Sequence, residues 1–216
     1  MKRQKLKMLA TNKYTGVNKD DPIRFYNLPF IGSMYRKRIE RCLYELSGGE
    51  RILEIGFGSG VTFLNLNEMY KEIYGVDLTA NIELITETFK ELKIQTFLKN
   101  GNVLNLPYQD GYFDSVLLIS ILEHLKTESL IPAFREIYRV LKPNGQIVYG
   151  VPVDKKIMNY AFRLLGSNIK EHHFSDQKQI VAAAKMLFKE VAISNMCVWP
   201  FGKLYEIGHF IKREVA

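Results

Sequence analysis

Three glycines at alternate positions, Gly56, Gly58 and Gly60, form the stretch of this sequence with the clearest chemical use. They follow the apolar, β-favouring residues 52–55 and precede an apolar helical pattern that begins at Val61. The order predicts a strand, a tight turn and a helix. Because glycine lacks a Cβ and adopts positive φ without strain, a ligand can lie against bare backbone at such a turn. We therefore expect a ligand that carries a ribose or another polar group.

An acidic residue follows at the place where a nucleotide-binding fold holds a ribose. Residues 73–77 have the pattern of a second strand that ends in Asp77, roughly 20 residues beyond Gly56. The dinucleotide fingerprint G-x-G-x-x-G is not matched, because Val61 occupies the position of its third glycine. The spacing disfavours a nicotinamide cofactor, although an oxidoreductase that uses one remains an alternative with the same fold.

Several motifs occur in the order typical of class I S-adenosylmethionine-dependent methyltransferases, and the sequence resembles that family. The motifs are Glu54–Gly60, Tyr74–Asp77, Asn102–Pro107, Phe113–Ile119 and Arg139–Gly145, and they cover about residues 50–153. The similarity is greatest to the small-molecule branch that contains ubiquinone and menaquinone methyltransferases. It implies an α/β, Rossmann-like, doubly wound fold with a mostly parallel seven-stranded sheet, helices on both faces and a single domain.

The resemblance also implies a set of residues for S-adenosylmethionine, which the reaction converts to S-adenosylhomocysteine. Asp77 would bind the ribose hydroxyls, and the Asn102 carbonyl would replace the family's usual Asp at the adenine amine. The cofactor-binding residues implied in this way are Glu54, Gly56, Phe57, Gly58, Ser59, Gly60, Asp77, Leu78, Asn102, Val103 and Ile119.

Glu123 and His124 follow the fourth predicted strand, at the carboxyl edge where open α/β sheets bind ligands. Methyl transfer requires an aligned nucleophile in a dry site, and a hydroxyl nucleophile must also lose a proton. Because the pKa of histidine lies near neutrality, His124 is a candidate general base with Glu123 beside it. Alternatively, the pair only shapes the loop and caps the next helix. Ser120 stands where similar metal-dependent quinone methyltransferases carry an acid, so we expect no metal.

Composition and charge suit one soluble domain, with 216 residues of which 47% are hydrophobic and 25% charged. No apolar run approaches the ~18 residues of a membrane span and the start lacks the apolar stretch of a secretory signal, so we expect a cytoplasmic protein. Cys42 and Cys197 stand alone in the sequence, and we expect both to be buried free thiols.

The net charge of +7 comes from residues 1–51, which contain 12 Lys or Arg and 5 Asp or Glu; the remaining residues contain 18 of each sign. We expect a mobile basic arm at residues 1–21, an N-terminal lid or helix segment at 22–48 and the methyltransferase domain at 49–216. The arm would attract a phosphorylated substrate, an anionic membrane surface or nucleic acid, or would simply be solvated. Aromatic residues either form a lid or cap the sheet edge; they are Tyr14, Phe25, Tyr26 and Phe30.

The predicted activity is methyl transfer to an O, N or C atom of a small acceptor that is lipid-like or phosphorylated, by a monomer or homodimer. No Asx/Ser-Pro-Pro-aromatic motif follows the fourth strand, which disfavours DNA amine methylation. RNA is also disfavoured, yet an RNA methyltransferase that uses the basic arm and a non-catalytic S-adenosylmethionine-binding protein remain alternatives. In the similar family, the region equivalent to residues 152–174 lines the substrate pocket.

The remaining pattern predicts the other elements that must position these residues. The Lys142–Gly145 stretch is expected to end a helix and form a turn, and Ser175 to cap a helix. Helices are expected at 34–46, 61–70, 79–92, 127–141 and 175–188, and strands at 94–98, 113–119, 146–151, 190–196 and the early part of 198–211.

Overall fold

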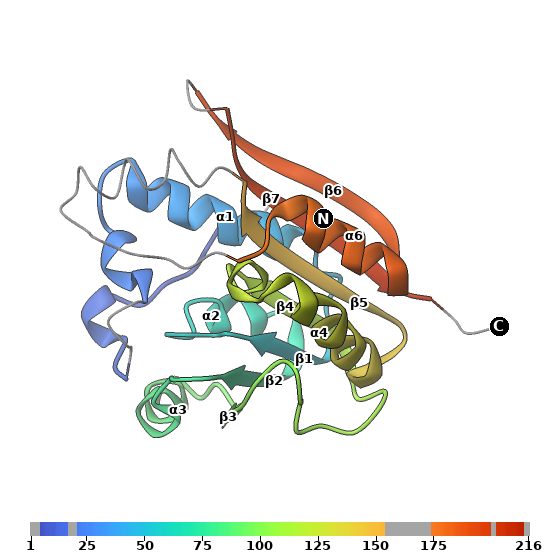
Figure 1. Ribbon diagram of the computed structural model, residues 1–216. Coiled ribbons are helices and arrows are strands. Elements are labelled where there is room, and N and C mark those ends of the chain that lie inside the picture. Colours follow the sequence, from blue (N-terminus) through green and yellow to red (C-terminus); the bar gives the residue numbers. More distant parts are fainter. Residues whose placement is uncertain (1–4, 17–20, 154–173, 200–201, 214–216) are drawn as a thin grey trace.

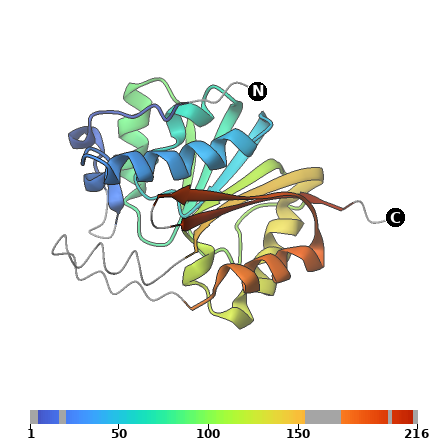
Figure 2. The ribbon, with the colours of Figure 1, turned by 90° about the horizontal axis from the view of Figure 1, so that it is seen from above.

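The computed structural model describes residues 5–16, 21–153, 174–199 and 202–213. In this part of the chain a seven-stranded sheet, in the order β3-β2-β1-β4-β5-β7-β6, lies between two layers of helices (Figures 1 and 2). The strands β1 to β5 are parallel, and β6 and β7 form an antiparallel hairpin at one side. The predicted doubly wound, mostly parallel seven-stranded fold is confirmed. The strands are β1 (Gly49–Ile55), β2 (Tyr70–Asp77), β3 (Thr96–Asn100), β4 (Phe113–Ile119), β5 (Leu141–Pro152), β6 (Phe188–Val198) and β7 (Gly202–Lys212).

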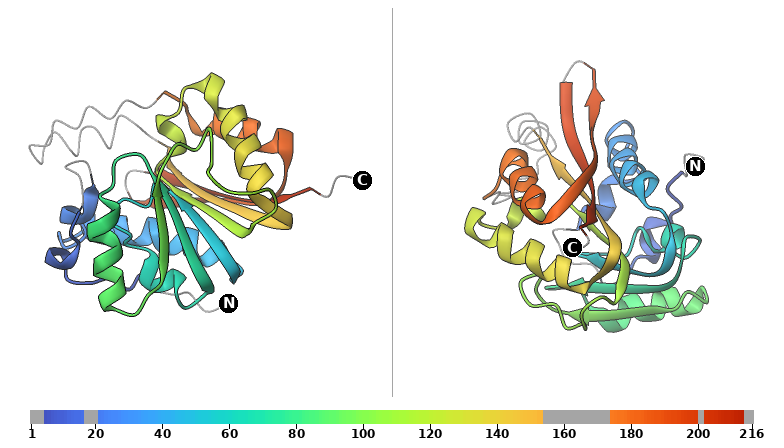
Figure 3. Two further views of the ribbon diagram at one scale, coloured as in Figure 1. Left: turned by 90° about the horizontal axis from the view of Figure 1, so that it is seen from below. Right: turned by 90° about the vertical axis from the view of Figure 1, so that its right-hand side faces the viewer.

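The helices divide between the two faces of the sheet (Figure 3). One face packs against α1 (Ile31–Glu45), α2 (Phe63–Leu66) and α3 (Ile82–Glu91), and the other against α4 (Thr127–Val140) and α6 (Gln177–Leu187). Each face has its own apolar core, so the central strands are buried on both sides, as parallel strands usually are. Three short 3₁₀ turns complete the described elements: η1 (Thr11–Lys13), η2 (Pro22–Phe25) and η3 (Leu122–His124).

The helix after the glycine turn is much shorter than the sequence pattern predicts. The expected range was 61–70, whereas α2 is a single turn at Phe63–Leu66 and β2 already begins at Tyr70. Tyr70 pairs with Gly49 of β1 and its buried hydroxyl donates to Ser115 Oγ over 2.7 Å. Because Tyr70 belongs to the sheet, the helical stretch has to end before it.

Several other boundaries differ by a few residues, among them those of α1, α3 and β3, and at α6 the reason is local. Asp176, rather than the predicted Ser175, caps α6: its carboxylate accepts from the Gln179 amide, and the Gln179 side chain accepts from the Asp176 amide, which together form a capping box. The Ser175 hydroxyl instead donates to the Leu125 carbonyl over 2.6 Å. In β5, the strand begins at Leu141, before the expected 146, and its register against β4 is irregular across the predicted turn.

The N-terminal residues that the structure describes lie against the body of the protein. The Lys7 amide donates to Asn65 Oδ1 over 2.9 Å, and Tyr14 is buried. The mobility predicted for the arm at residues 1–21 stays a prediction. Of the expected substrate-lining segment, only residues 152, 153 and 174 lie inside the described ranges. Both cysteines are free; Cys42 is buried as predicted, but the prediction for Cys197 was wrong because its side chain is exposed near the end of β6.

Gly150 of β5 lies against side chains of α1 and of the neighbouring strand β7. A Cβ at this position would stand 2.4 Å from Tyr205 Cε1 and 2.7 Å from Cys42 Sγ. We expect Gly150→Ala to lower the free energy of unfolding by about 1–3 kcal/mol through overpacking, measured by urea unfolding. Gly101→Ala is the matched control, because its Cβ would meet Val76 only at 3.2 Å. An equal loss in both variants would contradict this packing account.

Candidate active site

The carboxyl ends of β1, β2 and β4 meet at one edge of the sheet. Ile55 of β1 lies opposite Val76 of β2 and Leu118 of β4, so the residues that follow these three strands are neighbours. The Gly56 amide donates to the Val76 carbonyl over 2.7 Å, which holds the start of the glycine turn beside the end of β2. This edge is the place where open α/β sheets bind their ligands.

The glycine turn has the backbone conformation that its residues predict. The φ values are 72° at Gly56, 52° at Gly58 and 71° at Gly60. Residues with a Cβ rarely adopt this region of φ. The three positions differ in what surrounds them. A Cβ on Gly60 would lie 2.7 Å from the Phe63 ring and 2.8 Å from the Phe89 ring, so this glycine permits close helix packing.

The other two glycines lie directly against side chains of other elements. A Cβ on Gly58 would stand 2.6 Å from Asp21 Oδ2, and one on Gly56 would stand 2.0 Å from Ile121 Cδ1. A side chain at either position would therefore collide with Ile121 or Asp21, so glycine allows these elements to pack against the turn. Ser59 is buried, and so is the Phe57 ring, which packs against Phe63 with ring centroids 5.7 Å apart.

Asp77 ends β2 with its carboxylate held at the glycine turn. Oδ2 accepts from the Gly58 amide over 3.0 Å, while Oδ1 accepts from the Thr79 and Ala80 amides, each over 2.9 Å. These bonds fix the carboxylate at the edge of the sheet, where it can accept from ligand hydroxyls. Leu78, the next residue, is 69% exposed.

Glu54 occupies a buried position beneath the turn. Burial raises the pKa of its carboxyl to about 8. The Thr62 hydroxyl donates to this carboxyl and lowers the pKa, whereas the nearby negative charge of Asp77 raises the pKa further. At neutral pH the group is therefore mostly protonated. Glu54 supports the turn from below as a neutral acid.

The loop after β3 lies beside the end of β2. The Gly101 amide donates to the Asp77 carbonyl over 3.0 Å, and Asn102 Oδ1 accepts from the Leu104 amide over 3.0 Å. Asn102 is exposed and Val103 is buried in the core, so only the backbone of Val103 can contact an adenine, as the resemblance implies. Ile119 is the half-buried last residue of β4, the strand that pairs with β1 on the side away from β2.

Asp21 is a residue of this edge that the sequence interpretation missed. Its Oδ2 accepts from the Ser59 amide and its Oδ1 from the Ile23 amide, both over 2.8 Å. Burial raises the pKa of this carboxyl, and the two amides counteract the shift. The Asp-Pro pair at residues 21–22 is typical of the start of a 3₁₀ turn or helix, and this local pattern was the signal in the sequence for Asp21 as a capping residue. Through Asp21 the N-terminal segment contacts the glycine turn directly.

Glu123 and His124 belong to η3, directly after β4. Glu123 is 2% exposed, and its carbonyl accepts from the Phe174 amide over 2.9 Å and from the Ser175 amide over 3.3 Å. His124 is exposed. The turn begins at Ser120, a non-glycine residue with φ of 58°, which redirects the chain at the edge of the sheet. The structure thus brings the pair to the predicted edge, and its catalytic role stays a prediction.

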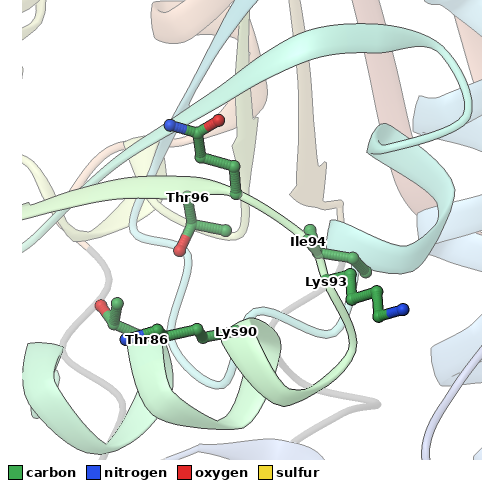
Figure 4. A pocket seen from close by; sticks show the side chains of 6 residues that line it. Thr86, Lys90, Lys93, Ile94 and Thr96 are labelled. Carbon is green, nitrogen blue, oxygen red and sulfur yellow. The ribbon is translucent and has the colours of Figure 1, made fainter.

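Two hollows in the described surface lie away from this edge. One of about 340 Å³ lies between the end of α3 and the start of β3, where Figure 4 shows Lys90, Lys93 and Thr96. The other, of about 200 Å³, is lined by Asp114 and Lys142 at the amino ends of the strands. Neither includes a residue of the glycine turn, so neither belongs to the candidate site.

The described ranges contain neither a candidate metal cluster nor a membrane-spanning helix. There, three or more His, Cys, Asp or Glu side chains do not gather in a way that would hold a metal ion. No helix in the same ranges combines the length and the apolar character that crossing a membrane requires.

Comparison with known proteins identifies the fold and the domain. Residues 53–149 match the family model described as a methyltransferase domain. The chain is 29% identical to norajmaline N-methyltransferase of Rauvolfia serpentina, over 68% of this chain and 47% of that protein. It is 27% identical to the probable tRNA methyltransferase 9B of Homo sapiens, over 80% of this chain and 36% of that protein.

A solved structure supports the same fold. The N-methyltransferase NodS of Bradyrhizobium japonicum, in complex with S-adenosylhomocysteine, superposes with a TM-score of 0.67 and 18% identity, over 94% of this chain and 100% of that one. The first three curated relatives are matched over 47%, 63% and 47% of their own lengths. The glycine turn with its positive φ values and the fixed Asp77 carboxylate fit S-adenosylmethionine, the cofactor of the methyltransferases that the chain resembles. Residues 53–149 match a methyltransferase domain, and the chain is similar to S-adenosylmethionine-dependent methyltransferases in sequence and fold.

Proposed function

We propose that this protein transfers a methyl group from S-adenosylmethionine to a small amphiphilic acceptor. The observation that carries the proposal is the meeting of the glycine turn, Asp77 and the Glu123–His124 pair at one edge of the sheet. When bound, the cofactor supplies an electrophilic methyl group on a sulfonium. The protein has to orient this methyl and the acceptor atom in line and to exclude water.

The cofactor contacts follow from the side chains at the edge. Asp77 is the proposed acceptor for the ribose hydroxyls, and three amides hold its carboxylate in place. The exposed Asn102 amide and the Val103 backbone meet the adenine. The glycine turn would hold the methionine portion, and Glu54 keeps the turn in place as a neutral acid.

His124 is the better candidate of the pair for general base. It is exposed at the edge, whereas Glu123 is buried in the turn. An imidazole can accept the proton that an acceptor hydroxyl or amine releases on methylation. In this arrangement Glu123 holds the position of the turn and His124 meets the acceptor.

This assignment predicts a kinetic effect. His124→Gln should lower kcat by about 100-fold and leave S-adenosylmethionine affinity within a few-fold, because the base acts only in the chemical step. Lys126→Gln, a neighbouring exposed change, is the matched control. Initial rates and a pH–rate profile measure the effect. A His124→Gln enzyme with the wild-type rate and pH profile would show that the pair only shapes the loop.

The acceptor class is inferred from the surface near the edge. Three large apolar side chains are exposed there. Phe30 in the N-terminal segment is 60% exposed, Leu78 after β2 is 69% exposed, and Phe174, which is bonded to η3, is 50% exposed. Large exposed apolar side chains around a site favour an apolar or amphiphilic ligand. The names of norajmaline N-methyltransferase and NodS support a nitrogen atom as the methylated position.

The proposal is tested with S-adenosylmethionine that carries a tritiated methyl group. The full-length protein is incubated with a small-molecule extract and, separately, with purified total RNA. We expect label in the solvent-extractable products and none in acid-precipitable RNA. Label in RNA alone would support RNA methylation that uses the basic N-terminal arm, and cofactor binding without transfer to either fraction would support a non-catalytic binding protein.

A further inference from the structure

Arg38 of α1 places a cation among aromatic rings on the sheet-facing side of the helix. Its Cζ lies 4.2 Å from the centroid of the Tyr35 ring and 5.9 Å from that of Tyr205. Nη1 donates to Ser120 Oγ over 3.2 Å, and the Tyr205 hydroxyl lies 2.9 Å from the same oxygen. Arg38 as a whole is half-buried, while its Nε is shielded from solvent and has no hydrogen-bond partner.

The charge of Arg38 is not balanced by an ion pair in the part of the chain that the structure describes. Asp21 interacts electrostatically with Arg38, and its carboxylate is already bonded to the Ile23 and Ser59 amides. The buried Glu123 is a second acid near the cluster, and it acts electrostatically on Tyr205. A shielded cation without a carboxylate is costly, and contacts with aromatic faces compensate only in part. An anion that binds from solution would complete the charge balance.

The position of the cluster indicates which ligand would supply that anion. Ser120 follows β4, whereas Asp77 ends β2, and these two strands lie on opposite sides of β1. The cluster therefore lies across the glycine turn from the predicted ribose position. Glu123 and His124 follow Ser120 in the same turn. This is the side of the site where the proposed acceptor has to bind.

We propose that Arg38, with the hydroxyls of Ser120 and Tyr205, binds a carboxylate or phosphate group of the methyl acceptor. The proposal rests on the proposed function and adds a substrate class to it, an anionic amphiphile. A guanidinium presents N–H donors in a planar fork that matches two oxygens of a carboxylate or phosphate. One of the two hydroxyls donates to the other, so the pair can offer one hydrogen to a remaining oxygen, and the unbonded Nε is a further donor.

The test uses inorganic phosphate and acetate as probes on the full-length protein. Thermal unfolding is followed with rising phosphate or acetate at constant ionic strength, in the presence of S-adenosylhomocysteine. Arg38→Met removes the charge and keeps an apolar side chain, Arg38→Lys keeps the charge without the fork, and Arg41→Met changes an exposed arginine on the same helix. We expect at least one anion to stabilise the wild type and Arg41→Met, and its apparent Kd to rise by about tenfold or more in Arg38→Met.

Unfolding without any added anion separates a binding role from a structural one. If Arg38 serves a ligand, Arg38→Met should unfold at the wild-type temperature or above it, because an unpaired charge has been removed. A variant that unfolds well below the wild type and responds to the anion as the wild type does would overturn the proposal. Failure of both phosphate and acetate to stabilise the wild type would also overturn it.

A second arm distinguishes the acceptor from the cofactor as the source of the anion. Affinities for S-adenosylhomocysteine, which has an amino-acid carboxylate, and methylthioadenosine, which has none, are measured for the wild type and Arg38→Met. Similar values in the two proteins support an acceptor site. A loss of about tenfold or more for S-adenosylhomocysteine alone would assign Arg38 to the cofactor carboxylate and overturn the proposal. If the wild type binds an anion but neither S-adenosylhomocysteine nor methylthioadenosine, the anion site at Arg38 stands and the proposed function is refuted.

Discussion

Replacing Asp77 by alanine is expected to weaken S-adenosylmethionine binding by about 100-fold. The carboxylate is the predicted acceptor for two ribose hydroxyls, and a hydrogen bond to a charged group contributes about 1.5–3 kcal/mol. Asp77→Asn should lose less, about tenfold, because its carbonyl still accepts one bond. Isothermal titration with S-adenosylmethionine and S-adenosylhomocysteine measures both variants.

The control for Asp77 lies on the same strand. Glu72 of β2 interacts with Arg51 at the other end of the strand, so Glu72→Gln should bind the cofactor as the wild type does. Because Asp77 also accepts from the amides of Thr79 and Ala80, the alanine variant should be less stable without ligand, and its folding must be checked by circular dichroism. Wild-type affinity in a folded Asp77→Ala protein would remove Asp77 from the cofactor site.

The second large effect concerns Glu54 and the dependence of stability on pH. The pKa of its carboxyl is about 8 in the folded protein, against an ordinary value of 4.5, because burial disfavours the charged form. Between these two values the folded state holds a proton that the unfolded state has released. The contribution of Glu54 to the free energy of unfolding is therefore fully present below about pH 4.5 and is lost as the pH rises through about 8.

Glu54→Gln removes this titration and keeps the shape of a neutral acid. The variant should match the wild type near pH 4.5 and exceed it by roughly a few kcal/mol at pH 9, since one pKa unit corresponds to about 1.4 kcal/mol. Urea unfolding of both proteins from pH 4.5 to 9 measures the difference, in which the contributions of other groups cancel. A difference that stays constant with pH would show that Glu54 titrates near its ordinary value.

The central strands of the fold could be predicted because their signals are local and strong. Residues 116–119 form an apolar run shortly after a turn at 109–111, and the structure places them in β4. Asp77 and the glycine turn were located by spacing alone, because parallel strands bring their carboxyl ends to one edge. Helix lengths were predicted less well: the pattern after Gly60 is helical in hydrophobicity, but Tyr70 pairs in the sheet and limits α2 to one turn.

The parts of the site that could not be predicted come from contacts between residues far apart in the sequence. Asp21 reaches the Ser59 amide, and Arg38 reaches Ser120, pairs that no local pattern connects. One weak signal was present for Arg38, since it lies four residues before the buried Cys42 and therefore on the same face of α1. The different surroundings of Gly56, Gly58 and Gly60 also depend on residues that pack against the turn from other elements.

The measurement that tests the central claim most directly is equilibrium unfolding of the full-length protein with S-adenosylmethionine, S-adenosylhomocysteine or NADH. At about 100 times the dissociation constant, a ligand that binds one site in the folded state adds roughly 2.7 kcal/mol to the free energy of unfolding. We predict this increase with the first two ligands and none with NADH. An increase with NADH alone, or with none of the three, would contradict the assignment of the site.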